Sequence, residues 1–399
     1  MKNKRQVISG SIITGLFLFF VAYAFAENIL TPATVAKNIL EGASITEQIA
    51  GFEGRYNGAF ANKTVFVDIN GLGHRVLLQR KSDYVLLLNN GHASQAMDNR
   101  PDENIQANAE AIIAFSRWFE EEKDGNFLYV QVPYKNSKYD VQLPAGIVDY
   151  SNDVADRFLR CLDGCVNTLD LRESIKREEL DHYALFLPSD HHWNPRGGFF
   201  AFTEICAFMA ENFGEKIDPT VLNLENYHIE LYKNSSMGSF GNKAGSGFVG
   251  YDDFELIYPR FETQQICTIP HKQITRSGTF YDAIFETSNF SMPLRERRLY
   301  GSYIGGDYPL VIHENKMAQN EDTVVVFIDS FGTPVESFLT TAFQNVIAID
   351  LRWVLRSGMK ESAVDFIERY QPDTVIVMFN PNQIGFAESE QFKYGLPND

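Results

Sequence analysis

Three short runs of Val, Ile and Phe near the end of the chain limit its fold more than any other feature. They lie at 323–328, 345–349 and 374–379, and helical patterns begin between them near Thr333 and near Gly358. Strands that are apolar on every residue are typical of parallel sheets that helices cover on both faces. The alternation of such strands with helices predicts successive β-α-β units and therefore an α/β fold with three layers.

Residues that can carry chemistry follow these three strands. Ser330, Arg352 and Asn380 each come within three residues of a strand end. Because the carboxyl ends of parallel strands gather at one edge of the sheet, we expect the three residues to converge there. Thr333 fits a helix N-cap, with Glu336 completing a capping box, so Ser330 would lie in a turn with unpaired backbone N–H groups nearby. Such groups can stabilise an oxyanion.

Asn380 and Arg352 each allow two interpretations. Asn380 could donate a side-chain hydrogen bond to an oxyanion, or it could be a turn residue ahead of Pro381. Arg352 could hold a carboxylate or an oxyanion, or it could pair with an acidic neighbour such as Asp350 or Glu361. The sequence leaves both choices open.

A second polar cluster lies in the middle of the chain, where Asp190, His191 and His192 precede Asn194-Pro195. That pair fits a helix N-cap and first helical residue, and apolar residues then recur at helical spacing. In extended backbone, residues two apart share one side, so Asp190 would face His192 and His191 would point away. Asp190 would then orient the His192 ring, whose far nitrogen can take a proton from the hydroxyl of Ser330.

Two simpler interpretations of this cluster remain open. Adjacent histidines beside a carboxylate could bind a metal ion, or the cluster could be a polar helix cap with Trp193 packed behind it. A metal site needs a third or fourth ligand, and the other histidines of the chain have no ligand-like spacing. We therefore predict that the site uses no metal and no cofactor.

Composition excludes some classes of partner. The chain has 399 residues, is 44% hydrophobic and carries a formal net charge of −17. This is ample apolar material for a large core. The acidic balance argues against a nucleic-acid partner, since binding to phosphate backbones depends on clustered Lys and Arg.

The first 26 residues have the pattern of an export signal. Lys2, Lys4 and Arg5 precede an apolar run, and Ala24-Phe25-Ala26 fits a cleavage site. The run just reaches the length that spans a bilayer, so the segment predicts either a cleaved signal peptide or an N-terminal membrane anchor. Both place residues 27–399 outside the cytoplasm.

Residues 27–399 are interpreted as a single domain. Within it we predict strands over 64–88 with a turn at Asn70-Gly71, a helix over 103–122 and a strand over 127–132. Tyr134, Lys135 and Asn136 follow that strand and are weaker site candidates. An irregular, β-containing insertion rich in Gly and aromatic residues extends over about 220–320 and could form a wall of the site. Cys161 and Cys165 could bridge or stay free.

These motifs resemble those of a known family. Asp190-His191-His192-Trp193 and, later in the chain, Asp329-Ser330-Phe331 resemble the DHHW family, a branch of the SGNH (GDSL-like) hydrolases, and are similar to the alginate O-acetyltransferases of the AlgX/AlgJ type. The resemblance implies Ser330 as nucleophile, His192 as base and Asp190 as orienting acid. Asn380 matches the SGNH asparagine by strand order. In place of the usual Gly two residues before the nucleophile, this chain has Ile328.

The hypothesis that follows is an extracytoplasmic serine esterase or O-acyltransferase, with acetyl as the expected acyl group, that acts on a cell-envelope or exported carbohydrate. The resemblance alone implies a membrane-bound protein as acyl donor. One competing hypothesis is a catalytically silent SGNH-like binding or assembly component of an envelope polysaccharide pathway. A weaker one is a metal-dependent enzyme that uses His191 and His192.

Overall fold

The computed structural model describes residues 15, 18–29 and 59–396. The chain divides into two compact units, Met1–Asn70 and Gly71–Asp399, and all the features that concern function lie in the second. The predicted export signal over residues 1–26 falls largely outside the described residues. Within the described ranges, no helix has both the length and the apolar character that crossing a membrane requires.

A mixed sheet forms the centre of the second unit. Within residues 59–396 it has eight strands in the order β5-β4-β13-β11-β12-β10-β8-β9. The first five are parallel to one another, and β10, β8 and β9 each pair antiparallel with their neighbours. In chain order the strands are β4 (Asn126–Gln131), β5 (Thr168–Asp170), β8 (Gln265–Ile269), β9 (Ile274–Gly278), β10 (Leu310–Asn315), β11 (Asn320–Ile328), β12 (Phe343–Ile349) and β13 (Thr374–Phe379).

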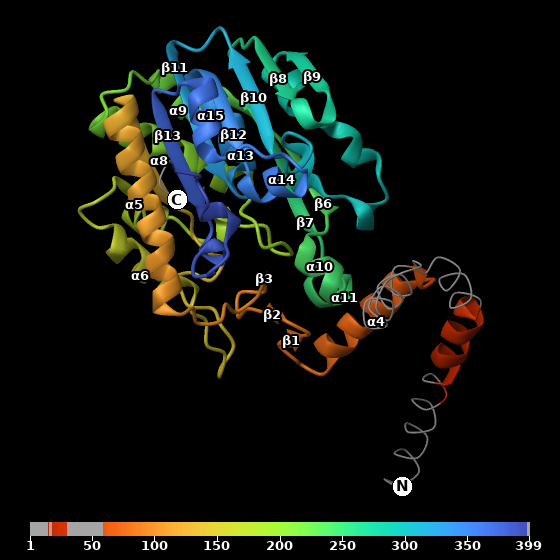
Figure 1. Cartoon of the computed structure of the whole chain (residues 1–399). Coiled ribbons are helices and arrows are strands. Elements are labelled where there is room, and N and C mark those ends of the chain that lie inside the picture. Colours follow the sequence, from red (N-terminus) through yellow and green to blue (C-terminus); the bar gives the residue numbers. More distant parts are fainter. Residues whose placement is uncertain (1–14, 16–17, 30–58, 397–399) are drawn as a thin grey trace, which may run out of the picture. The chain divides into compact units, whose positions relative to one another are not determined.

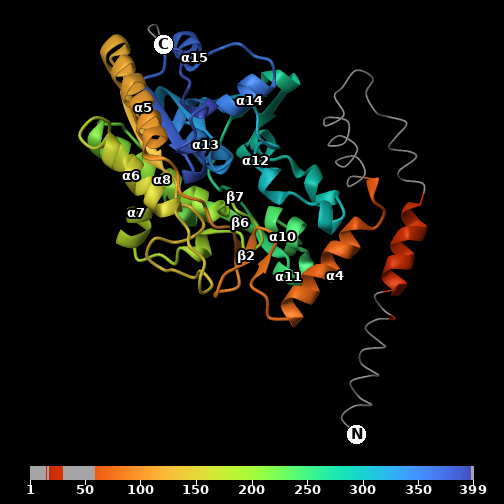
Figure 2. The same ribbon diagram turned by 60° about the horizontal axis from the view of Figure 1, so that its bottom comes forward.

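Helices cover both faces of this sheet. α8 (Pro195–Asn212) and α13 (Gly332–Ala342) pack on one face. The opposite face is covered by α5 (Asp102–Lys123), α6 (Ser151–Leu162), α14 (Leu351–Arg356) and α15 (Ala363–Tyr370). Figures 1 and 2 both show α5 and α6 side by side. The predicted α/β fold with three layers is confirmed, and the predicted helix over 103–122 and strand over 127–132 are confirmed with it.

The segment at 220–320 does more than surround the sheet. Its strands β10, β8 and β9 continue the sheet beyond β12, and Figure 1 shows β8 and β9 in teal on the far side of β10. They pair with backbone groups that would otherwise be left open at the edge of β12. The same segment forms a separate two-stranded ribbon from β6 (Tyr227–Ser236) and β7 (Asp252–Pro259).

The remaining elements are short. The helices are α4 (Lys63–Val76), α7 (Leu171–Arg177), α9 (Pro219–Leu222), α10 (Ser239–Ala244), α11 (Ser246–Val249) and α12 (Phe280–Ile284). A small sheet contains β1 (Lys81–Ser82), β2 (Val85–Leu87) and β3 (Ala93–Ser94). Cys161 and Cys165 are free and exposed, whereas Cys206 and Cys267 are buried.

The prediction of strands over 64–88 is wrong in its first half, because α4 occupies residues 63–76. Apolar residues at Phe66, Ile69 and Leu72 recur every three residues, which fits a helix, and this period prevails over the alternation that suggested strands. Gly71 is not a turn residue. A Cβ atom at Gly71 would lie 2.3 Å from the carbonyl oxygen of Ala244, so close packing explains the glycine.

The contact between α8 and α13 gives a stability prediction. A Cβ atom at Gly198 would lie 2.7 Å from Cβ and Cγ of Pro334. We expect Gly198→Ala to lower the free energy of unfolding by about 1–3 kcal/mol, because the two helices must separate to admit a methyl group. Urea denaturation measures this change.

Gly73→Ala is the matched control for this prediction. Gly73 is also helical, and a Cβ atom there would meet nothing within 4 Å. Its substitution should leave stability unchanged or raise it by up to about 1 kcal/mol. A Gly198→Ala variant as stable as the wild type would contradict the close contact between the helices.

Candidate active site

A chain of hydrogen bonds joins Asp190, His192 and Ser330. The Oδ1 atom of Asp190 lies 2.7 Å from Nδ1 of His192, and Nε2 of His192 lies 2.8 Å from Oγ of Ser330. With a neutral ring that carries its proton on Nδ1, His192 donates to Asp190 and accepts from the Ser330 hydroxyl. The structure therefore brings together three side chains that the sequence separates by as many as 140 positions.

Asp190 and His192 belong to a tight turn, Leu187–His192. The backbone N–H of Leu187 donates to the carbonyl of His192, and an isolated bridge between Phe186 and Trp193 closes the turn. The N–H of His192 also donates to Oδ1 of Asp190 at 3.0 Å. The expected N-cap of α8 is confirmed, since the Asn194 side chain accepts from the N–H of Gly197.

The expectation that His191 points away from Asp190 is wrong. Its Nδ1 lies 3.2 Å from Oδ1 of Asp190, and its ring centroid is 3.7 Å from that of His192. The backbone bends through these residues instead of staying extended, so the alternation of side chains does not apply. Both histidine rings therefore lie against one carboxylate.

A segment from the insertion completes the surroundings of Asp190. The backbone N–H of Ser239, at the start of α10, donates to Oδ2 of Asp190 at 2.6 Å, and its hydroxyl lies 2.8 Å from Nδ1 of His191. A Cβ atom at Gly238 would lie 2.3 Å from Cβ of Asp190, so only glycine fits there. The glycine-rich pattern of this part of the insertion does not predict the contact with Asp190, because nothing in the pattern indicates a partner.

Ser330 lies at the carboxyl edge of the sheet between β11 and α13. The neighbouring Asp329 is buried, and its carboxylate accepts from the backbone N–H groups of Phe331 and Asn380 at 2.9 Å and 2.8 Å. It thereby ties the end of β11 to the end of β13. Within residues 59–396, no acceptor is found for the backbone N–H of Ser330.

The predicted start of the following helix is wrong in detail. α13 begins at Gly332, and its N-cap position is Phe331, which makes no side-chain cap. Glu336 is buried with its Oε2 3.5 Å from Nε2 of His313, so it does not complete a capping box with Thr333. In this turn the N–H of Phe331 donates to the carboxylate of Asp329, the residue that precedes Ser330.

Two aromatic residues contact His192 and the backbone around Ser330 from the side. The ring of Tyr300 stacks on that of His192 with centroids 4.0 Å apart, and its hydroxyl donates to the carbonyl of Ser330 at 2.8 Å. The indole N–H of Trp193 donates to the carbonyl of Phe331 at 3.0 Å. Sequence analysis missed Tyr300, because one tyrosine among many in the insertion carries no signal of its own.

Arg352 and Asn380 both lie at the same edge and already have partners. Arg352 pairs with Asp350, with Nη2 at 2.5 Å from Oδ2. The Oδ1 atom of Asn380 accepts from the N–H of Asn382, and its Nδ2 donates to the carbonyl of Pro133 at 3.4 Å. These contacts match the structural interpretations of an ion-paired arginine and a turn residue.

Among the weaker candidates, Lys135 reaches the Leu187–His192 turn. Its ammonium donates to the carbonyls of Leu187, Pro188 and Asp190. Tyr134 and Asn136 instead donate to the carbonyl of Gln95.

The charges of the resting site follow from burial and neighbours. Burial, together with the charge of His191, lowers the pKa of His192 to about 4, although Asp190 opposes this. Burial alone would raise the pKa of Asp190, but the two histidines hold it well below its usual range. At neutral pH the site therefore holds an ionised carboxylate and a neutral imidazole that can accept a proton.

The distances between Asp190, His191 and His192 also bear on whether these side chains could bind a metal ion. In the described part of the chain, Asp190, His191 and His192 are the one group of three such side chains with ligand atoms within 4.8 Å of one another. Two ligands of a tetrahedral zinc ion, each about 2.0–2.1 Å away, are roughly 3.3 Å apart. The 2.7 Å between Asp190 Oδ1 and His192 Nδ1 fits a shared proton better than two ligands.

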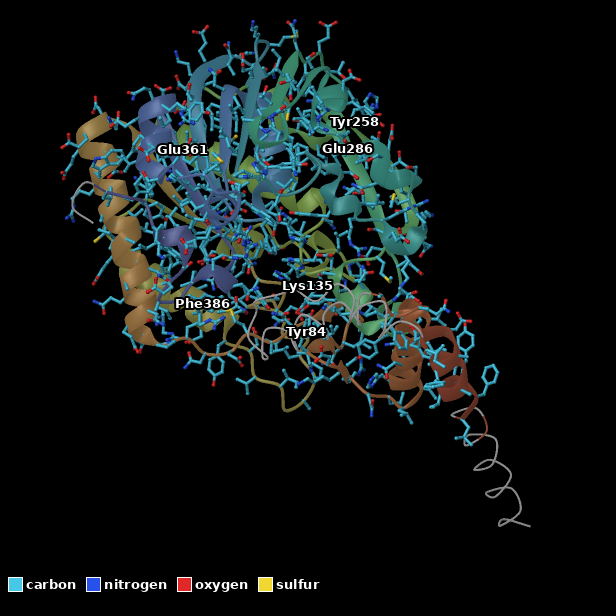
Figure 3. All side chains as sticks on the ribbon, turned by 45° about the vertical axis from the view of Figure 1, so that its right-hand side comes forward. Tyr84, Lys135, Tyr258, Glu286, Glu361 and Phe386 are labelled. Carbon is cyan, nitrogen blue, oxygen red and sulfur yellow. The ribbon has the colours of Figure 1, made fainter. Side chains whose placement is uncertain are left out.

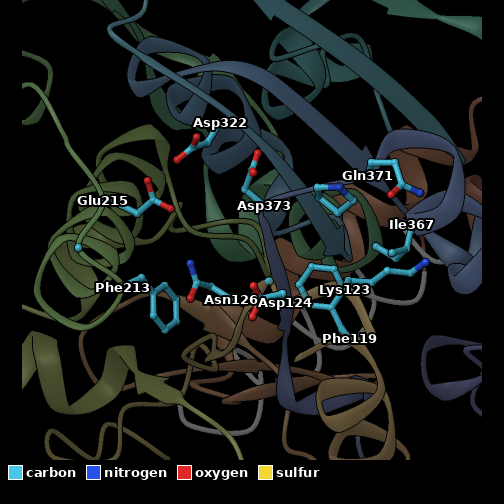
Figure 4. Close-up of a pocket in the computed structure, with 13 residues that line it drawn as sticks. Phe119, Lys123, Asp124, Asn126, Phe213, Glu215, Asp322, Ile367, Gln371 and Asp373 are labelled. Carbon is cyan, nitrogen blue, oxygen red and sulfur yellow. The ribbon is translucent and has the colours of Figure 1, made fainter. Parts of the chain in front are cut away.

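A pocket of about 380 Å³ lies at the opposite, amino edge of the sheet (Figure 4). Figure 4 shows the carboxyl groups of Glu215 and Asp322 turned toward each other, and burial, followed by Asp322, raises the pKa of Glu215 to about 6. Glu215 accepts from Asn320, and Asp373 accepts from the N–H of Thr323. Glu215 and Asp373 therefore accept hydrogen bonds from residues at the amino end of β11, whereas Ser330 follows its carboxyl end.

Comparisons with known proteins agree with the fold. Residues 91–250 match the sequence model of the SGNH hydrolase-like domain of acetyltransferase AlgX. The matched segment contains Asp190 and His192 and ends before Ser330. No curated protein matches the sequence.

Solved structures with a similar fold include PatB1 of Bacillus cereus with a sulfonyl adduct, with a TM-score of 0.64 and 18% identity over 79% of this chain and 99% of that chain. PatB1 without the adduct has a TM-score of 0.61 and 21% identity, over 79% of this chain and 98% of that chain. A DHHW family protein from Eubacterium siraeum has a TM-score of 0.59 and 17% identity, over 78% of this chain and 95% of that chain. The resemblance to SGNH hydrolase-like proteins of the AlgX and DHHW types is confirmed.

The electrostatics of the site predict the titration of His192. We expect its ring to titrate at about pH 4 in a nitrogen-detected NMR experiment. Asp190→Asn should lower this pKa further, because the carboxylate stabilises the imidazolium. A His192 that titrates above its usual value near 6.5 would contradict a buried site that favours the neutral ring.

Proposed function

We propose that this chain, which carries an SGNH hydrolase-like domain of the AlgX type, is an extracytoplasmic serine esterase or O-acyltransferase that acts on acyl esters of a carbohydrate. The observation that carries the proposal is the chain of hydrogen bonds from Asp190 through His192 to the Ser330 hydroxyl. An alcohol bonded to a neutral imidazole, which is bonded in turn to a carboxylate, is the arrangement that activates serine for attack on an ester.

The proposed reaction begins with attack of Ser330 Oγ on the ester carbonyl. Nε2 of His192 takes the hydroxyl proton, and the ionised Asp190 stabilises the imidazolium. The tetrahedral intermediate collapses, His192 returns the proton to the leaving alcohol, and the acyl group stays on Ser330. Water or a sugar hydroxyl then gives its proton to His192 and attacks the acyl-enzyme. When this second tetrahedral intermediate collapses, the bond between the acyl carbon and Ser330 Oγ breaks, and His192 returns the proton to Ser330 Oγ.

The oxyanion needs donors at the carboxyl edge. The backbone N–H of Ser330, which has no acceptor within residues 59–396, is the first candidate. Asn380 is a second candidate in this proposal, since its Nδ2 has two hydrogens and the bond to Pro133 uses one. Arg352 forms an ion pair with Asp350, so we assign it no direct role with an anionic substrate.

Acetyl is the proposed acyl group, since the matching family model is that of an acetyltransferase. A carbohydrate substrate is proposed from the resemblance to the alginate O-acetyltransferases. An open pocket of about 780 Å³ beside Arg352, which Gln383, Phe386 and Ser389 also line, offers space for a ligand. The predicted export signal supports a place outside the cytoplasm, and the family resemblance is the reason to propose a membrane-bound acyl donor.

The first test is covalent labelling together with ester turnover. We expect the purified protein to react with a fluorophosphonate or a sulfonyl fluoride and to hydrolyse an acetyl ester. Ser330→Ala should abolish labelling and lower kcat by roughly 10⁴-fold or more, because the nucleophile is lost. Ser291→Ala removes an exposed serine and serves as the control.

If the wild type and Ser330→Ala are equally inert, catalysis is excluded and a silent binding or assembly component takes its place. Loss of activity with a chelator, restored by zinc, would instead support the metal-dependent hypothesis.

The pH profile is a second test. Since His192 must be neutral to accept a proton, kcat/KM should rise as pH increases through about 4 and not near 6.5. Asp190→Asn should lower kcat by roughly 10⁴-fold while the variant stays folded, because the base loses its orienting carboxylate. Steady-state kinetics across pH measure both effects, and an Asp190→Asn variant with wild-type kcat would exclude the role of Asp190.

A further inference from the structure

Lys135, labelled in Figure 3, is buried in the second unit. Its side chain is 1% exposed, and it comes from the loop after β4. Nζ donates to the carbonyl oxygens of Leu187 at 2.6 Å, of Pro188 at 3.0 Å, and of Asp190. All three carbonyls belong to the Leu187–His192 turn.

A buried ammonium is costly unless its surroundings compensate for the lost water. Here the three carbonyls use all three N–H groups of the lysine. The carboxyl group of Asp252 acts on the same charge, and the ring of Phe240 lies 5.6 Å from Nζ. So specific a set of acceptors around one cation indicates that the lysine determines the course of the turn.

Other hydrogen bonds hold separate parts of the turn. Asp252 holds it from the side, since its carboxylate accepts from the N–H and the hydroxyl of Ser189 at 2.8 Å and 2.7 Å. The hydroxyl of Ser189 accepts in turn from the N–H of Gly238 at 2.7 Å. The carbonyls of Leu187 and Pro188 also accept from the N–H groups of Asp190 and Ala93, at 3.3 Å and 2.8 Å. The ammonium of Lys135 joins both carbonyls to that of Asp190.

We propose that Lys135 is a positioning residue of the active site, which fixes the backbone of Asp190 and through it the orientation of His192. The inference rests on the proposed function, since it concerns the same site. Without the ammonium, three carbonyl dipoles would face one another around an empty space, so the turn would shift. A shift of about 1 Å in a catalytic group can cost about 100-fold in rate.

The position of Lys135 also predicts a pH effect. Burial lowers its pKa to about 7, although Asp252 and Asp190 oppose this, and His92 is a further titratable group close by. The ammonium is present below that pH and is lost above it. A neutral amine has two N–H groups for three carbonyls, so kcat should fall as pH rises through about 7, on the opposite side from the His192 limb.

The experiment compares Lys135→Met with Lys138→Met in the full-length protein. Lys138 lies three residues on and pairs with Asp156 and Glu173 at the surface, so its loss should leave kcat unchanged. For Lys135→Met we expect kcat to fall by about 100-fold with KM unchanged, and the descending limb near pH 7 to disappear. Circular dichroism and Tm establish that each variant is folded.

A folded Lys135→Met variant with wild-type kcat and wild-type pH profile would overturn the inference. If that variant does not fold, the wild-type profile decides: a kcat that does not decrease as pH rises through about 7 overturns it. An inert wild type that takes no fluorophosphonate would mean that the proposed function fails. The positioning role is then decided by NMR, because a His192 pKa that is the same in Lys135→Met and in the wild type would exclude it.

Discussion

The candidate site depends on burying the polar backbone of the Leu187–His192 turn, of which the carbonyl of Pro188 accepts from a strand residue, Ala93 of β3. One isolated bridge closes the turn, and the contacts that define its interior are polar: the Lys135 ammonium on three carbonyls and the Asp252 carboxylate on Ser189. Buried polar groups are costly unless every one has a partner, so few arrangements satisfy such a network. The geometry of Asp190 and His192 is set by this constraint rather than by a helix or a strand.

Two buried aspartates lie near Ser330, and their surroundings give them different hydrogen-bond partners and charges. Asp329 is adjacent to Ser330 in sequence, but its oxygens accept from backbone N–H groups and burial raises its pKa. Asp190 lies far away in sequence, yet it faces both histidine rings, which keep its pKa low. The first aspartate joins strand ends, and the second is available to stabilise a cation on His192.

Much of the fold was predictable because it repeats a local pattern. The apolar strands, α5 and α8 follow from periodicity and capping, and the convergence of Ser330, Arg352 and Asn380 follows from parallel strands. The prediction failed where a strand pattern and a helix pattern overlapped, as in α4. There Asn70-Gly71 suggested a turn, but the glycine is needed for close packing against Ala244. It also failed at α13, which begins at Gly332 without a side-chain cap, while Glu336 lies beside His313 instead of completing a capping box with Thr333.

The site divides in the same way. Residue types and order along the chain were enough to name Ser330, His192 and Asp190 as candidates, since each occurs in a motif with its own local signal. Tyr300 on the His192 ring, Ser239 on Asp190 and Lys135 beneath the turn have no such signal. The sequence by itself determined the layered α/β architecture and the chemical groups at its carboxyl edge, because periodicity and motif are local. Only the tertiary structure decided how those groups are oriented and charged, because burial and hydrogen bonding depend on side chains brought in from distant parts of the chain.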